Sequence, residues 1–276
     1  MWSRFGIRGL WLDDRYGGAS AVVTDFRAGL LVTKSLRGEV VGQPDAFVAQ
    51  DGSSGSEVVR RLLEAPSVEN LRCGALREAI ASVRWVARVG FSETRAWDGD
   101  DYIVTPGDGA CAVVRFRGEG CVAVLVSLDP SREIRVEDIL ASASPAMQEL
   151  AKEVLALPLL SADTMSPVTA LFWGDAGRIV SGEAWPATYT YGAEILRCEL
   201  LDDEAWLSLM ATYENVTPRY MEAVVALAHM RYATNGCIEI EPDWFEELVP
   251  PDGRFKQDAM GLLAELGFTR PARTDR

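Results

Sequence analysis

The pattern of hydrophobic and polar residues changes period several times along this chain, and each change predicts a different element. Three short apolar or alternating stretches come first and are separated by glycine-containing turns: residues 4–12, 19–26 and 29–37. Such stretches predict a three-stranded meander, because successive strand residues point to opposite faces of a sheet. A polar loop follows, in which Ser54 and Glu57 have the spacing of a capping box for a short helix that Pro66 ends.

The next segment predicts a helix and then a strand. From about residue 68, apolar residues recur at helical spacing: Leu71, Ala75, Leu76, Ala79 and Ile80. From Val83 onwards the apolar positions alternate with Arg84 and Arg88, so a strand is expected over 83–91.

The middle of the chain contains the clearest hairpin signal. A turn is expected at 97–101, and residues 110–117 are expected to pair with 121–128 around Gly118-Glu119-Gly120. Helices are predicted near 136–142 and 146–157. Residues 158–167 then form a candidate linker between an N-terminal part, 1–157, and a C-terminal part, 168–276, although the two parts can also form one continuous domain.

The C-terminal part is predicted to be mainly helical. Strands are expected near 168–173, 177–181 and 188–200. Asp202-Asp203-Glu204 then opens a helix, and Thr217-Pro218 caps a long helix to about 233. A short strand at 237–240 and helices near 243–249 and 255–266 complete the chain. This mixed order without regular βαβ alternation predicts an α+β fold, in which antiparallel sheets of hairpins and meanders pack with helices.

Composition places the chain among soluble globular proteins. Of its 276 residues, 48% are hydrophobic and 25% are charged, and its apolar runs are too short to cross a bilayer. The cysteines are odd in number and include no CxxC pair: Cys73, Cys111, Cys121, Cys198 and Cys237. This pattern favours free thiols in a reducing cytoplasm over a disulfide framework or a zinc site, and no cofactor or metal is expected.

Three sequence features resemble ligand-binding or catalytic motifs but are better explained as turns or as part of a packed helix. The glycine pattern at 107–112 precedes a strand instead of a helix, so it lacks the context of a dinucleotide site. The acidic turn at 98–101 lacks the spacing of a calcium loop. His229 is the only histidine and lies on the edge of a helical apolar face, although a nucleophilic pair with one of the cysteines stays open.

The negative charge is concentrated near the C-terminus. The formal net charge is −14, and residues 183–265 alone hold 16 acids and 5 bases, a difference of −11. In and directly after residues 239–247, Ile240, Trp244, Phe245 and Leu248 are expected to face the core while the carboxylates project outward. The candidate partner-binding residues are Glu239, Glu241, Asp243, Glu246, Glu247, Asp202, Asp203 and Glu204.

Three functions are compatible with these features. The first is a non-catalytic cytoplasmic module whose acidic half docks a basic protein such as a toxin or nuclease, most concretely a bacterial immunity or antitoxin protein. The second is an enzyme with carboxylate or cysteine chemistry between the two parts, using Glu183, Glu194 and Glu199. The third is a helix-turn-helix-like regulator, but Arg254 and Lys256 are few bases for phosphate contacts, so nucleic acid is not the expected partner.

Overall fold

The computed structural model describes residues 10–12, 21–27, 30–34, 62, 64–90, 94–106, 110–127, 134–160, 167–213 and 216–270. The capping box at Ser54 and Glu57 and the glycine pattern at 107–109 lie outside these ranges. The first three ranges are the strands β1 (Leu10–Leu12), β2 (Ala21–Arg27) and β3 (Leu30–Lys34). They pair antiparallel in the order β1-β2-β3, which confirms the predicted meander.

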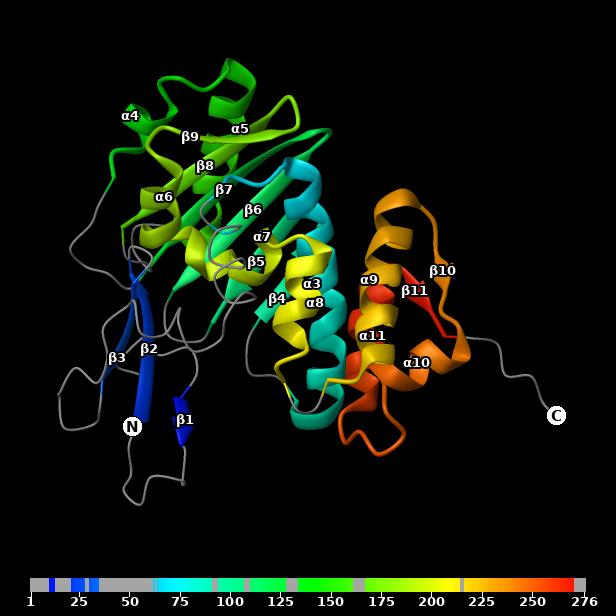
Figure 1. Ribbon diagram of the computed structural model, residues 1–276. Helices are drawn as coiled ribbons and strands as arrows, with labels where there is room; N and C mark the ends of the chain where they lie inside the picture. The colour runs from blue at the N-terminus through cyan, green and yellow to red at the C-terminus, as the bar shows by residue number, and fades with distance from the viewer. Residues whose placement is uncertain are drawn as a thin grey trace.

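A six-stranded antiparallel sheet forms the centre of the fold (Figure 1). Its strands are β4 (Thr94–Asp98), β5 (Asp101–Thr105), β6 (Cys111–Arg117), β7 (Gly120–Val126), β8 (Ala170–Asp175) and β9 (Arg178–Ser181), paired in that order. The α+β prediction, the turn at Gly99-Asp100 and the hairpin of β6 with β7 are thereby confirmed. β7 also pairs with β8, so the sheet takes strands from both sides of the candidate linker 158–167.

Both faces of this sheet are covered. On β6 and β7, Val113 and Val124 contact a core beneath α4 (Val136–Leu140) and α5 (Pro145–Leu155), while Val114 and Ala123 contact the larger core under α3. A short 3-10 helix, η2 (Pro158–Leu160), follows α5. The apolar runs of β6 and β7 therefore reflect strands that are buried on both sides.

One long helix, α3 (Val68–Val89), lies between the sheet and the C-terminal helices (Figure 1). The strand predicted over 83–91 is wrong, because Val83 and Ala87 continue the helical buried face of Ile80. Trp85 and Val89, which a strand would place beside Val83, are 57% and 55% exposed.

The strand predicted over 188–200 is also wrong. This segment forms α6 (Trp185–Tyr191), the 3-10 helix η3 (Ala193–Leu196) and α7 (Arg197–Leu200). Thr188, Leu196 and Leu200 are buried there, so the contacts follow helical turns although the sequence alternates. Packing against the sheet thus overrides the local strand preference of the aromatic and β-branched residues.

The C-terminal part is helical, as predicted. It contains α8 (Asp203–Met210), α9 (Pro218–Ala233), α10 (Pro242–Leu248) and α11 (Lys256–Glu265), with the parallel strands β10 (Ile238–Glu239) and β11 (Phe268–Thr269). The predicted helix start after Asp202 and the predicted cap at Thr217 are both present. The Asp202 side chain accepts from the Ala205 amide, and the Thr217 side chain accepts from the Tyr220 amide. Among the helices described, none is long and apolar enough to cross a membrane.

The close approach of α3 to α7 gives the first testable prediction. A Cβ on Gly74 would lie 1.9 Å from the backbone oxygen of Glu199, whereas a Cβ on Gly261 of α11 would meet open space. Gly74→Ala should therefore destabilise the fold by about 1–3 kcal/mol through overpacking. Gly261→Ala should stabilise it by about 0.5–1 kcal/mol, since alanine is the better helix former.

Denaturant unfolding of the two glycine variants beside the wild type measures both effects. Equal stability of Gly74→Ala and the wild type would show that α3 and α7 are not in the close contact described.

Candidate functional site

The predicted partner-binding carboxylates form two groups. One group, Asp202 to Glu204, lies at the start of α8, and the other lies on β10 and α10. In the second group, four side chains are exposed, and together they are called the acidic surface below: Glu239, Glu241, Asp243 and Glu246.

The acidic surface is carried by a well-anchored segment. Ile240 and Leu248 are buried, and Trp244 and Phe245 are partly buried against the same core, as the sequence predicted. The Ile240 amide also donates a hydrogen bond of 3.1 Å to the Thr269 carbonyl, next to the β10–β11 pairing. Such anchoring limits the conformational freedom that the segment would lose on binding.

Glu247 does not project outward as expected. Its side chain is 23% exposed, and its Oε2 accepts hydrogen bonds from Arg84 Nη1 at 3.2 Å and from the Thr217 hydroxyl at 3.1 Å. The Arg84 guanidinium also lies 4.7 Å from the centre of the Tyr220 ring. Glu247 therefore joins α10 to α3 and to the start of α9. Asp243 makes an ion pair with Arg219, but both side chains are more than half exposed, so that pair contributes little to stability.

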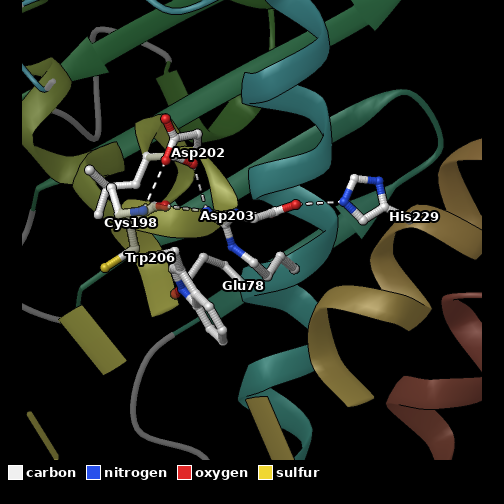
Figure 2. Close-up of polar contacts among 9 residues, drawn as sticks. Glu78, Cys198, Asp202, Asp203, Trp206 and His229 are labelled. Carbon is white, nitrogen blue, oxygen red and sulfur yellow. Dashed lines mark hydrogen bonds and ion pairs between the residues drawn. The ribbon is translucent and has the colours of Figure 1, made fainter. Parts of the chain in front are cut away.

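Asp203 is likewise part of an internal contact (Figure 2). Its Oδ1 lies 2.6 Å from Arg77 Nη1, and its Oδ2 lies 2.6 Å from Nε2 of His229 on α9. Burial raises the pKa of Asp203, but the hydrogen bonds from His229 and Arg77 outweigh burial and hold this pKa below its ordinary value. Asp203 is therefore ionised at neutral pH and links α3, α8 and α9.

Arg77 is the residue that sequence reasoning missed. It is 1% exposed, and its Nη2 donates to the carbonyls of Cys198 at 2.9 Å and Leu201 at 2.8 Å. Its guanidinium also lies 5.0 Å from the centre of the Trp206 ring. The available signal was an arginine between Cys73 and Ile80, within the otherwise apolar face of α3.

A second ionic cluster, formed by Glu78, Glu199 and Arg95, lies next to the Arg77–Asp203 contact. Glu199 on α7 is fully buried, and its Oε1 accepts from the Tyr102 hydroxyl at 2.9 Å and from Arg95 Nε at 3.2 Å. Glu78 Oε1 accepts from Trp206 Nε1 at 2.5 Å, and Glu78 Oε2 lies 3.6 Å from the same Arg95 nitrogen. Within the described part of the chain, Glu199 Oε2 is buried without a hydrogen-bond partner. Two buried carboxylates thus share one guanidinium.

Burial raises the pKa of Glu78 above its ordinary value of 4.5, and the neighbouring Glu199 adds to the increase. Arg95 and Arg77 act in the opposite direction without cancelling it. Glu78 therefore holds its proton to a higher pH than an exposed glutamate does.

The structure places the carboxylates considered for catalysis on separate elements, with Glu199 on α7. Glu183 accepts a hydrogen bond from Thr188 at 3.4 Å, and Glu194 lies on η3 instead of a strand. Burial raises the pKa of Cys111 to about 11 and that of Cys121 to about 12, so both thiols are protonated at neutral pH. His229 Nε2 faces Asp203, which leaves the proposed cysteine–histidine pair without support.

The two bases considered for a DNA-binding helix, Arg254 and Lys256, both contact neighbouring residues of this chain. Lys256 Nζ donates to the Pro251 carbonyl, and the Arg254 guanidinium lies 5.6 Å from the centre of the Phe255 ring. In the ranges that the structure describes, no three His, Cys, Asp or Glu side chains gather as metal ligands. Comparison with protein-family models, curated proteins and solved structures gave no match.

The Arg77–Asp203 contact gives a stability prediction. Asp203→Ala should destabilise the protein by about 2–3 kcal/mol, because the buried Arg77 guanidinium loses its counter-charge. The control Glu222→Ala, at an exposed position of α9, should shift stability by about 0.5 kcal/mol or less. Thermal and denaturant unfolding distinguish the two, and equal effects would contradict a structural role for Asp203.

The raised pKa of Glu78 gives a prediction about pH. As pH rises above 4.5, Glu78 releases its proton in the unfolded chain but retains it in the folded protein. This difference should make the free energy of unfolding fall with increasing pH over the window that begins at 4.5. Glu78→Gln cannot titrate, so it should remove that part of the slope while its amide oxygen still accepts from Trp206.

Denaturant unfolding at a series of pH values measures the slope for the wild type and Glu78→Gln. Glu69→Gln, an exposed substitution on the same helix, serves as the control. A slope shared by all three proteins would overturn the assignment of the shift to Glu78.

Proposed function

We propose that this protein is a non-catalytic protein-binding module that docks a basic protein on its acidic surface. The concrete instance is a bacterial immunity or antitoxin protein that occludes a basic toxin or nuclease in the cytoplasm. The observation that carries the proposal is the exposure of Glu239, Glu241, Asp243 and Glu246 on one anchored segment.

The protein surface around these four residues also carries mainly negative charge. Across residues 216–270, further exposed acids are Glu222, Asp252, Asp258 and Glu265. The exposed bases in that range are Arg219, Arg254 and Arg270. A surface of one predominant sign accelerates the approach of an oppositely charged partner and penalises partners of like charge.

The contacts of each carboxylate decide which residues can be replaced to test this proposal. Asp203 and Glu247 are engaged with Arg77, His229 and Arg84, so replacing them would test folding before it tested docking. Glu241 and Glu246 are exposed and lie on α10 or at its N-cap, which makes them the sharper choice for charge reversal.

The test begins with the full chain, tagged and purified from its native host, and with identification of the protein that co-purifies. That partner should carry a net positive charge, and its association rate with the wild type should fall as salt increases. Glu241→Lys with Glu246→Lys should slow association by about tenfold and reduce its salt dependence.

The matched control reverses two exposed acids elsewhere, Glu119 and Glu149, and so changes the net charge by the same amount. This control should retain most of the wild-type association rate. An acidic or neutral partner, or equal rates for both double variants, would contradict docking at the acidic surface.

A further inference from the structure

An apolar groove lies beside the acidic surface, between α10, α11 and β11. Its volume is about 240 Å³, and its walls include Phe245, Met260, Leu263 and Phe268. Small-molecule sites commonly have volumes of about 300–1,000 Å³. The groove is therefore suited to a large side chain of a protein partner, which would be held there as an anchor.

Three exposed carboxylates are neighbours of residues that line this groove, in the sequence or in strand register. Glu241 precedes Phe245 by one turn of α10, and Glu265 follows the lining residue Ala264 on α11. Glu239 is paired in register with the lining residue Thr269. All three acids are exposed, so negative charge lies on the surface close to residues that line the groove.

Arg270 is the exception in sign. It lines the groove, and its guanidinium lies 5.5 Å from the centre of the Phe245 ring. A cation thus already lies over an aromatic ring of the groove. An incoming basic segment would compete with Arg270 for this position.

We infer that the groove receives a large apolar side chain of the basic partner, and that flanking lysines or arginines of the same segment pair with Glu239, Glu241 and Glu265. This inference rests on the proposed function and adds the kind of segment that is recognised. An apolar anchor in a central pocket with charged groups at the rim is a common arrangement in protein interfaces. A second copy of this chain is a poor occupant, because each copy has a formal net charge of −14.

The test measures the binding of synthetic peptides to the full-length protein by fluorescence anisotropy. The first probe is a short lysine-rich peptide with one central tryptophan. The second has serine in place of the tryptophan, and the third has glutamate in place of the lysines. The first should bind about tenfold more tightly than the second, and the third should not bind.

Three variants separate the groove from the charge. Ala264→Trp fills the groove without changing charge and should abolish the preference for the tryptophan peptide, whereas Ala211→Trp, at an exposed turn after α8, should preserve it. Arg270→Ala should tighten binding of the first peptide severalfold, because a competing cation is removed.

The outcomes distinguish this inference from the proposed function. Equal affinity of the first two peptides for the wild type, or an unchanged preference in Ala264→Trp, would contradict binding of an apolar side chain in the groove. Either result would leave the proposal of docking by charge intact. Failure of both basic peptides to bind, together with no effect of charge reversal on the natural partner, overturns both proposals. Concentration-dependent dimerisation that Ala264→Trp abolishes would make a second copy the occupant and also overturn the inference.

Discussion

The buried guanidinium of Arg77 is the interaction on which the arrangement of the C-terminal helices depends. A charge removed from water is costly unless hydrogen bonds and a counter-charge surround it. Arg77 obtains these from Asp203 and from the carbonyls of Cys198 and Leu201, so the α7–α8 connection supplies the partners that the buried face of α3 requires. Asp203 extends the contact to His229 and thereby to α9 (Figure 2).

This requirement also limits which acids are available to a partner. The C-terminal excess of acids in the sequence looks like one continuous property, but Glu199 is fully buried and Asp203 is paired with a buried arginine. Glu247 joins three helices. The charge that remains exposed on one anchored segment is that of the acidic surface, next to the apolar groove. Glu199, Asp203 and Glu247, which have buried or partly buried partners, are therefore distinct from the exposed acids that we propose for docking.

The close packing of α3 on α7 brings two carboxylates, Glu78 and Glu199, together in the interior, where polar contacts offset part of the cost of their burial. Gly74 allows the backbone of α7 to approach α3, which places Glu199 beside Arg95 and Tyr102. A shared guanidinium and hydrogen bonds from Tyr102 and Trp206 offset part of the cost of burying two like charges. The raised pKa of Glu78 reflects the cost that remains.

The sequence by itself determined the elements whose signals are local. Glycine turns and apolar runs specify the β6–β7 hairpin, and Asp202 and Thr217 specify the starts of α8 and α9, because turns and caps involve residues a few positions apart. The exposure of the acidic surface also follows from the local sequence, because the same short segment carries the apolar residues that anchor it.

Tertiary structure decided the rest. Whether 83–91 and 188–200 became strands or helices depended on the surfaces available to bury Val83 and Leu196. The pairing of Arg77 with Asp203 joins residues more than a hundred positions apart, and no local pattern encodes such a distance. The same holds for the groove, whose walls come from three separate elements that only packing brings together.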